Sequence, residues 1–258
     1  MKLLLIDNAK PDSCEYTRLL EQKMKFLCDH VICCHEIHDV LQYFIHDEAK
    51  PDLVILSGSS LNVSEPQKIF YLRKSISTLL RSKDVPVLGI CFGMQLISLV
   101  YGGDVERMSL ANKCETIIKV EKGSVLLNNE ECNLNVTLSH QDFVASVPDD
   151  FCIFSKNKNS IQIFESLKFL CFGVQFHPEK IANNEKKCVL TNFTKFVHER
   201  CTLPPHVKIS DELRINIIHT IGMKSLPHIR KKFDVDVDQI MSIWRHHMKI
   251  WNLPALLI

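Results

Sequence analysis

A chain of 258 residues is long enough to bury a sizeable core, and its net charge of +1 excludes a broad basic or acidic surface for nucleic acid or an anionic membrane. The composition, with 46% hydrophobic and 24% charged residues, is that of a globular protein. No apolar run approaches the length of a transmembrane helix. We therefore expect no nucleic-acid partner and no membrane partner.

Strands and helices alternate in the first ninety residues. Short apolar runs predict the strands, and apolar residues spaced three and four apart predict the helices. This alternation is typical of an α/β fold with a mostly parallel central sheet and helices on both faces, in which ligands bind beyond the carboxyl ends of the strands. The predicted strands cover residues 3–6, 30–34, 53–56 and 85–90, and the predicted helices cover 12–26, 40–46 and 67–80.

A different pattern follows a predicted helix at residues 94–101. Short apolar segments separated by turn-forming residues, such as Asn128-Asn129-Glu130, predict a series of short strands. A further helix is predicted from about Asn184 to Glu199. The short strands are predicted at residues 117–120, 135–138, 143–147, 152–155, 161–164 and 170–175.

Two consecutive prolines, Pro204 and Pro205, predict a boundary near residue 202. We expect a domain of residues 1–201 and a C-terminal helical extension of residues 202–258 whose role the sequence does not indicate. Helices are predicted in the extension at 211–221 and from about 236 to 251. Their partly apolar faces fit a tail packed on the main domain, or an arm that binds a partner.

Eleven cysteines, an odd number with no Cys-x-x-Cys pair, lie mostly in apolar stretches and are interpreted as small buried hydrophobic residues. The apolar run at residues 3–6 is too short for a signal peptide. We therefore expect a cytoplasmic protein in a reducing compartment.

One group of cysteines and histidines resembles a metal site in composition but not in spacing. It matches no tight zinc pattern, and Val31-Ile32 within it continue a predicted strand. We expect no metal there, and no cofactor elsewhere, since the chain has no phosphate-binding glycine loop. The group consists of Cys28, His30, Cys33, Cys34, His35 and His38.

The segment 87–95 places a cysteine between two glycines, at the point where a predicted strand ends and a helix begins. Gly89 and Gly93 are small neighbours that should allow the backbone to turn sharply at Cys91. This pattern is that of a nucleophile elbow, which presents a side chain at the carboxyl end of a sheet. Cys91 is therefore predicted to attack a carbonyl carbon, and we expect its thiol to be partly exposed.

A cysteine nucleophile needs a base, and His177 is the candidate among twelve histidines. It follows an apolar strand in the segment Phe176-His177-Pro178-Glu179, where the proline ends the strand. Residues two apart in an extended chain point to the same side, so Glu179 can hold one imidazole nitrogen while the other faces the sulfur. Cys91, His177 and Glu179 are therefore predicted to form a catalytic triad.

These two motifs resemble the signatures of class I, or triad-type, glutamine amidotransferases. The first is Gly89–Gln95 with Gly102-Gly103, and the second is Gly173–Glu179. The segment 138–144 is similar to a Ser-His-x-Asp stretch in the amidotransferase domain or subunit of GMP synthetase, the member of the family that the chain most resembles. The resemblance covers residues 1 to about 200. It implies a flavodoxin-like amidotransferase fold and a glutaminase that forms a glutamyl thioester on Cys91.

The resemblance also implies roles for residues outside the triad. The backbone N–H of Phe92 and the loop around Gly58 would form the oxyanion hole, and Gln95 would lie near the substrate glutamine. The ammonia would pass to a separate synthetase, as in purine biosynthesis, since no synthetase half is visible in the chain. The segment expected to line the same substrate pocket consists of Ser139, His140, Gln141 and Asp142.

Two departures from the family pattern keep other functions open. The chain has Ser57-Gly58-Ser59-Ser60 where the family commonly has Ser-Gly-Gly-Pro, and residues 112–116 replace a Glu-Tyr-Gly element of the GMP synthetase type. The loop is also similar to that of the gamma-glutamyl peptidase-like branch, so a free-standing gamma-glutamyl peptide hydrolase is one alternative. A non-catalytic regulatory relative is the other, although the intact triad argues against it.

Overall fold

The computed structural model describes residues 1–8, 15–34, 50–65, 69, 76–77, 79–80, 85–181 and 188–201. Contacts divide the chain into two compact units, Met1–Val197 and His198–Ile258. The helices predicted at 40–46, 211–221 and 236–251 lie outside the described residues, as do His35, His38 and most of the helix predicted at 67–80.

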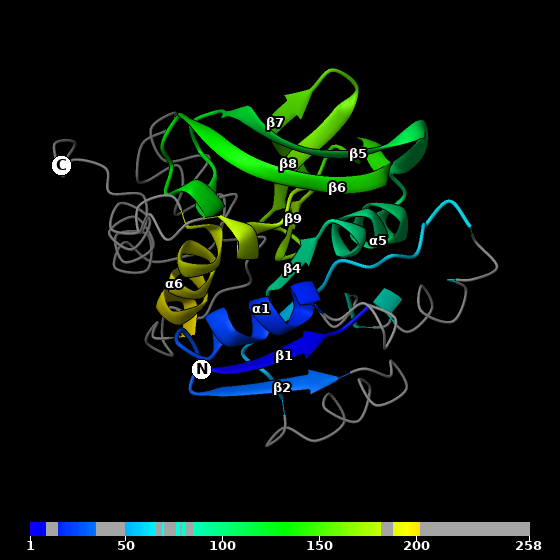
Figure 1. Cartoon of the computed structure of the whole chain (residues 1–258). Coiled ribbons are helices and arrows are strands. Elements are labelled where there is room, and N and C mark those ends of the chain that lie inside the picture. The colour runs from blue at the N-terminus through cyan, green and yellow to red at the C-terminus, as the bar shows by residue number, and fades with distance from the viewer. Residues whose placement is uncertain are drawn as a thin grey trace, which may run out of the picture. The chain divides into compact units, whose positions relative to one another are not determined.

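Seven strands of the described residues form a central sheet in the order β2-β1-β3-β4-β9-β8-β7 (Figure 1). The first five are parallel, and only β8 and β7 join in antiparallel fashion. Three inner strands are buried along their whole length, which explains their uninterrupted apolar sequences. The mostly parallel sheet predicted from the sequence is confirmed. The strands are β1 (Lys2–Ile6), β2 (His30–Cys34), β3 (Leu53–Leu56), β4 (Val87–Ile90), β7 (Cys152–Asn157), β8 (Ser160–Ser166) and β9 (Cys171–Val174).

Three described helices flank the sheet: α1 (Glu15–Met24), α5 (Phe92–Tyr101) and α6 (Val189–Cys201). All three are expected from apolar spacing. The predicted starts at residues 12 and 184 lie outside the described residues, and the other ends differ from the predicted ends by no more than two residues. In α1 the buried residues Thr17, Leu20 and Met24 are spaced by three and four. Helix α5 ends at Gly102, whose φ of 93° is a left-handed conformation that glycine adopts without strain.

A second, two-stranded sheet consists of β5 (Asp104–Val120) and β6 (Cys132–Ser146), which pair in antiparallel fashion as a long ribbon along the top of Figure 1. The sequence predicts only 117–120 in β5 and divides β6 into 135–138 and 143–147, so these lengths were wrong. Most side chains of β5 are exposed, so the strand shows little of the apolar alternation that reveals a half-buried strand. The ladder of main-chain pairs nevertheless runs along most of both strands.

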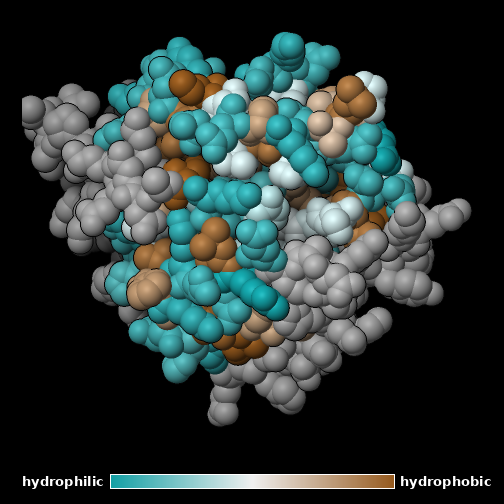
Figure 2. All heavy atoms as spheres, in the orientation of Figure 1, coloured by the Kyte–Doolittle hydropathy of each residue, from teal (hydrophilic) through white to brown (hydrophobic). Residues whose placement is uncertain are grey.

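Two 3-10 helices complete the described elements, η3 (Val125–Leu127) and η4 (Pro178–Lys180). Hydrophilic residues dominate the face shown in Figure 2, and apolar residues are scattered over it. Among the residues that the structure describes, no helix has the length and apolar character needed to cross a membrane.

Candidate active site

Polar residues that follow four parallel strands meet at one edge of the sheet. Asn8 lies just after β1, Ser57 after β3, Cys91 after β4 and His177 near the end of β9. The hydroxyl of Ser57 accepts a hydrogen bond from the backbone N–H of Asn8 at 2.8 Å, and the Asn8 side chain donates to the Ser57 carbonyl at 2.9 Å. The loop that contains Gly58 is therefore tied to the neighbouring strand end. This edge is where an open parallel sheet binds its ligands.

Cys91 has the backbone of a nucleophile elbow, with φ of 50° and ψ of −101° at the residue that precedes α5. A positive φ is unfavourable for a residue with a side chain, so Cys91 itself carries the strain of the turn. Neither Gly89 nor Gly93 has a positive φ. The glycines therefore do not make the turn through their own φ, and what they contribute is their small size, as expected from the sequence.

The two glycines instead allow close approach between the strand and the helix. A Cβ on Gly89 would lie 2.6 Å from the carbonyl oxygen of Gly93, and a Cβ on Gly93 would lie 2.6 Å from Cβ of Leu56. Both distances are far below van der Waals contact, so any larger residue would displace α5 from the sheet. The glycines position the elbow by packing.

The sulfur of Cys91 lies inside the molecule, at the edge of a cavity. The residue is only 3% exposed, so the expectation of a partly exposed thiol was wrong. The side-chain amide of Gln175 donates to Sγ at 3.5 Å, and Sγ lies 3.8 Å from the carbonyl oxygen of Ser139. Gln175 is not among the predicted site residues, although it belongs to the motif that contains His177.

His177 and Glu179 form a buried pair, each 2% exposed. Nδ1 of His177 lies 2.7 Å from Oε1 of Glu179, and the carboxylate can only accept, so the imidazole N–H donates. Glu179 reaches the ring from the short helix η4 rather than from an extended strand, because the chain turns at Pro178. The predicted contact is therefore present, but a turn produces it.

The second nitrogen of the imidazole, Nε2, is buried and has no hydrogen-bond partner among the described residues. Burial lowers the pKa of His177, but the nearby Cys91 and the hydrogen bond and charge of Glu179 outweigh burial and raise the pKa to about 10. A histidine with this pKa is protonated at neutral pH. The pair is thus suited to hold a proton beside the sulfur.

Strand β6 crosses the carboxyl edge of the sheet and holds three site residues through its carbonyl groups. The carbonyl of Thr137 accepts from the backbone N–H of His177 at 3.1 Å. The carbonyl of Asp142 accepts from the side-chain amide of Gln95 at 2.6 Å. With the contact between Ser139 and Cys91, these bonds fix the ribbon over the elbow. The ribbon therefore forms one wall of the site.

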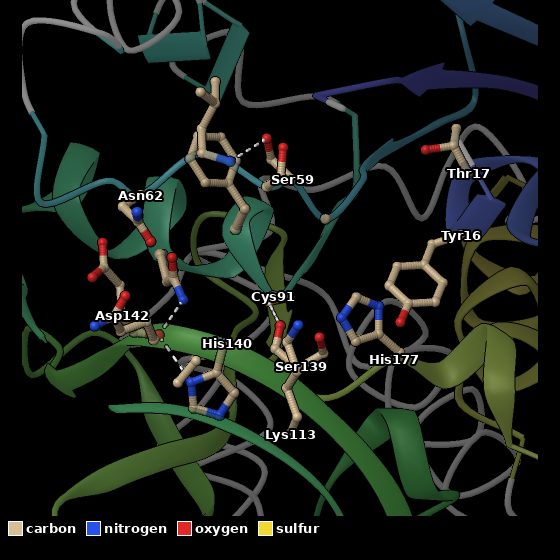
Figure 3. Close-up of a pocket in the computed structure, with 17 residues that line it drawn as sticks. Tyr16, Thr17, Ser59, Asn62, Cys91, Lys113, Ser139, His140, Asp142 and His177 are labelled. Carbon is tan, nitrogen blue, oxygen red and sulfur yellow. Dashed lines mark hydrogen bonds between the residues drawn. The ribbon is translucent and has the colours of Figure 1, made fainter. Parts of the chain in front are cut away.

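A cavity of about 320 Å³ opens beside Cys91 (Figure 3). It brings together most residues predicted for the site, while Glu179 lies behind His177 and does not line it. Gly58 in the loop after β3 was predicted from the sequence, but Leu61 and Asn62 of the same loop and the contributions of α1 and β5 were not. The lining comprises Tyr16, Thr17, Gly58, Ser59, Ser60, Leu61, Asn62, Cys91, Phe92, Gln95, Ala111, Lys113, Ser139, His140, Gln141, Asp142 and His177.

Gln95 and His140, which are predicted to line the substrate pocket, also make hydrogen bonds within the protein. Nε2 of Gln95 is committed to the carbonyl of Asp142, and it also lies 3.4 Å from Oε1 of Gln175. Nδ1 of His140 lies 3.0 Å from the same carbonyl of Asp142, and burial lowers the pKa of His140. The imidazole of His140 is therefore neutral at neutral pH.

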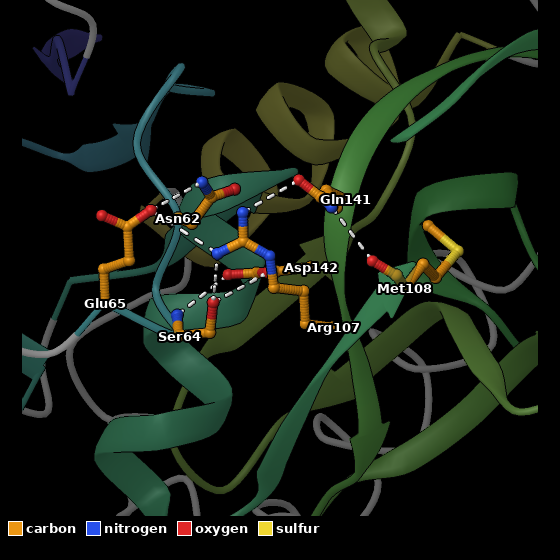
Figure 4. Close-up of polar contacts among 7 residues, drawn as sticks. All are labelled: Asn62, Ser64, Glu65, Arg107, Met108, Gln141 and Asp142. Atoms are coloured by element: carbon orange, nitrogen blue, oxygen red, sulfur yellow. Dashed lines mark hydrogen bonds and ion pairs between the residues drawn. The ribbon is translucent and has the colours of Figure 1, made fainter. Parts of the chain in front are cut away.

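The side chains of Asp142 and Gln141 belong to a polar network at the mouth of the cavity (Figure 4). The Asp142 carboxylate accepts from the backbone N–H of Ser64 at 2.9 Å and from its hydroxyl at 3.0 Å. Gln141 accepts from Arg107 at 3.0 Å and donates to the carbonyl of Met108 at 3.0 Å. These contacts join β5, β6 and the loop after β3.

Tyr16 follows the apolar spacing of a helix in the sequence, but it lines the cavity. Its ring centroid lies 4.6 Å from that of His177, and its hydroxyl accepts from Nζ of Lys180 at 2.8 Å. The bond from Lys180 lowers the pKa of Tyr16. No sequence signal separates this tyrosine from a core residue.

The fold and the site together define an α/β protein with a cysteine at a strand-to-helix elbow and a buried histidine–glutamate pair. The family model described as glutamine amidotransferase class-I matches residues 15–196. The chain belongs to this family, as its sequence motifs predicted.

Curated relatives agree with this assignment. The chain is 33% identical over 183 residues to a protein named GMP synthase (glutamine-hydrolyzing) from Petrotoga mobilis, covering 69% of this chain and 32% of that protein. It is 32% identical over 119 residues to a protein of Methanobrevibacter smithii that is named as a subunit of GMP synthase (glutamine-hydrolyzing), covering 46% of this chain and 63% of that protein. The matches thus span less than two thirds of either relative.

The fold is also that of a crystal structure from Thermoplasma acidophilum, whose protein is described as a GMP synthase subunit. The TM-score is 0.66 at 21% identity, and the match covers 78% of this chain and 96% of the other. The similarity supports the predicted flavodoxin-like α/β architecture.

Proposed function

We propose that the chain hydrolyses the side-chain amide of glutamine through a thioester on Cys91, giving glutamate and ammonia. One observation carries the proposal: Cys91 sits at an elbow beside a buried His177–Glu179 pair, and Cys91 and His177 face a common cavity. The catalytic assignment of these three residues is part of the proposal. Family membership and the names of the relatives support glutamine as the substrate.

Before substrate is attacked, the thiol proton of Cys91 is held on Nε2 of His177, because the raised pKa of His177 favours the protonated imidazole beside a thiolate. Nδ1–H remains bound to Glu179, which holds the ring in place and stabilises its positive charge. The thiolate then attacks the amide carbon of glutamine, and a carbon–sulfur bond forms. The carbonyl oxygen becomes an oxyanion.

Backbone N–H groups are proposed to stabilise this oxyanion. Phe92 is the first residue of α5, so its N–H has no partner within the helix. The second donor comes from the loop at Gly58. Ser59 and Ser60 stand where the family commonly has glycine and proline, and neither has a positive φ, so their side chains cause no backbone strain. The departure from the family loop is thus compatible with a working oxyanion hole.

Collapse of the tetrahedral intermediate breaks the carbon–nitrogen bond, and His177 gives its proton to the leaving nitrogen, which departs as ammonia. Neutral His177 next takes a proton from water, which attacks the thioester. Glutamate leaves, and the thiolate of Cys91 is restored beside protonated His177. In this scheme Gln95 and the segment 139–142 line the glutamine pocket.

We further propose that the ammonia serves a separate synthetase in the cytoplasm. Relatives named as GMP synthases, one of them as a subunit of such an enzyme, support a role of this kind in purine biosynthesis. Residues 1–201 would form the amidotransferase domain, and residues 202–258 would be an extension whose role is open. No cofactor is required by this chemistry.

Steady-state kinetics with the full chain test the proposal. We expect glutamine to be hydrolysed with release of ammonia, and faster when the synthetase partner is added. A large preference for gamma-glutamyl dipeptides over glutamine would instead select a gamma-glutamyl peptide hydrolase. No turnover of either substrate, with or without partner, would favour the non-catalytic relative and overturn the proposal.

Replacement of Gly58 by alanine is expected to lower kcat by about 10- to 100-fold with a smaller change in KM, because small displacements of catalytic groups are costly. A Cβ at this position would lie 3.0 Å from Cε1 of His177 and 3.8 Å from Cβ of Cys91. The ring would have to shift away from the added Cβ, which changes its position relative to Cys91. Unchanged kcat in Gly58→Ala, measured with glutamine, would contradict this arrangement.

A further inference from the structure

Lys113 is the one lysine or arginine among the described residues that line the cavity. It lies on β5 and is exposed, and its side chain has no hydrogen-bond or ion-pair partner among the described residues. Two other charged or titratable groups of the lining are engaged: the Asp142 carboxylate binds Ser64, and His177 is bound to Glu179. Within the described lining, the ammonium of Lys113 is therefore the cation that is not already paired with a carboxylate.

The geometry points to Lys113 as the receptor for the α-carboxylate of glutamine, a role that rests on the proposed function. Lys113 pairs with Ser139 across the ribbon, and the Ser139 carbonyl lies 3.8 Å from Sγ of Cys91. Figure 3 shows Lys113 beside Ser139, below Cys91 in that view. A lysine on this strand can thus reach into the space next to the nucleophile.

The dimensions of glutamine fit this placement. Four carbon–carbon bonds of about 1.5 Å each separate the amide carbon, which Cys91 attacks, from the α-carboxylate carbon. Opposite residues in an antiparallel pair lie about 4.5–5.5 Å apart at Cα, and the lysine side chain adds a flexible four-carbon stem. The ammonium can therefore meet the carboxylate while the amide carbon lies at the sulfur.

An irregularity in the ribbon directs Lys113 toward the cavity. Arg107 pairs with Asp142, but Asn112 already pairs with His140, so β5 contains extra residues between these positions. Bulges of this kind re-aim side chains and are common beside active sites. The extra segment places Ala111 and Lys113 in the cavity lining.

The network of Figure 4 holds this irregular segment in place. Arg107, at its start, donates to Gln141 at 3.0 Å and to the hydroxyl of Ser64 at 3.3 Å. Gln141 in turn donates to the carbonyl of Met108, within the segment. The polar network at the mouth thus supports the position from which Lys113 acts.

The test compares glutamine with glutaminamide, in which the α-carboxylate is an uncharged amide. In the wild-type chain we expect kcat/KM to favour glutamine by about 10-fold or more, the effect of one charge-assisted hydrogen bond. In Lys113→Met the KM for glutamine should rise by about 10-fold with little change in kcat, and the preference should fall to about 1. Glutaminamide kinetics should not change.

Two further variants serve as controls. Lys113→Arg keeps the charge and should retain most of the preference for glutamine. Lys119→Met removes another exposed lysine of β5, which pairs with Glu131 outside the cavity, and should leave both substrates unaffected. A preference unchanged in Lys113→Met would overturn the inference and leave the proposed function intact. Absence of glutamine hydrolysis in the wild-type chain would overturn the proposed function, and the inference with it.

Discussion

Replacement of Cys91 by alanine is expected to lower glutamine hydrolysis by at least about 10⁴-fold, since removal of the nucleophile eliminates the covalent route. Acid quenching of the wild-type reaction should trap a glutamyl group on the peptide that contains Cys91, and mass spectrometry should find none in Cys91→Ala. The fold should persist, because the thiol makes only long contacts, at 3.5 Å to Gln175 and 3.8 Å to Ser139.

A matched variant separates the chemistry of Cys91 from its strained backbone. Cys91→Gly also lacks the thiol, but glycine adopts a φ of 50° without the steric cost that any other residue incurs. We expect Cys91→Gly to have a free energy of unfolding about 1 kcal/mol higher than Cys91→Ala in urea titrations. Wild-type turnover of glutamine in either variant would contradict the thioester mechanism.

The parallel sheet and the location of the nucleophile could be predicted because both depend on local sequence. Buried parallel strands such as β3 and β4 are continuous apolar runs, and the carboxyl ends of such strands always meet at one edge. Cys91 and His177 each follow one of these runs. Their proximity in space then follows from the topology.

The backbone of the elbow could not be predicted in detail. The sequence presents two glycines around Cys91, and glycine is the usual residue at a positive φ. In the structure the positive φ belongs to Cys91, while the glycines serve the contact between β4 and α5. Only packing in three dimensions distinguishes these two uses of glycine.

The parts of the cavity lining that come from β5 and α1 were the least predictable part of the site. The exposed residues of β5 show no periodic apolar pattern, so the sequence predicts a strand that is too short and does not include Lys113. Tyr16 follows the apolar spacing of α1, as a core residue would. Both reach the cavity through contacts between segments far apart in sequence, which a local pattern does not encode.

Replacement of Glu179 by glutamine is expected to lower kcat by about 10²-fold or more, because carboxylate-to-amide changes at this position in serine triads cost about 10⁴-fold. The amide keeps the size of the side chain and an oxygen that can accept from Nδ1 of His177, but it removes the charge that favours the protonated imidazole. The pH at which kcat is highest should therefore differ between the wild type and Glu179→Gln. The measurement is kcat with glutamine from pH 6 to 10.

The same variant tests the pKa of His177 through stability. The pKa is about 10 in the folded chain against 6.5 for an ordinary histidine, so the native state binds more protons between these values. The resulting stabilisation is fully present below pH 6.5 and is lost as the pH rises through about 10. Urea unfolding should show a steeper loss of stability over this window in the wild type than in Glu179→Gln.

Another buried carboxylate supplies the control for that measurement. Burial raises the pKa of Glu165 to about 7 from 4.5, despite hydrogen bonds from Ser124, Val125 and Leu126 that lower it. Its stabilisation is present below pH 4.5 and is lost as the pH rises through about 7. Glu165→Gln should therefore flatten the stability profile between pH 4.5 and 7, and leave the slope above pH 7 unchanged. Equal slopes above pH 7 in the wild type and Glu179→Gln would show that Glu179 does not raise the pKa of His177.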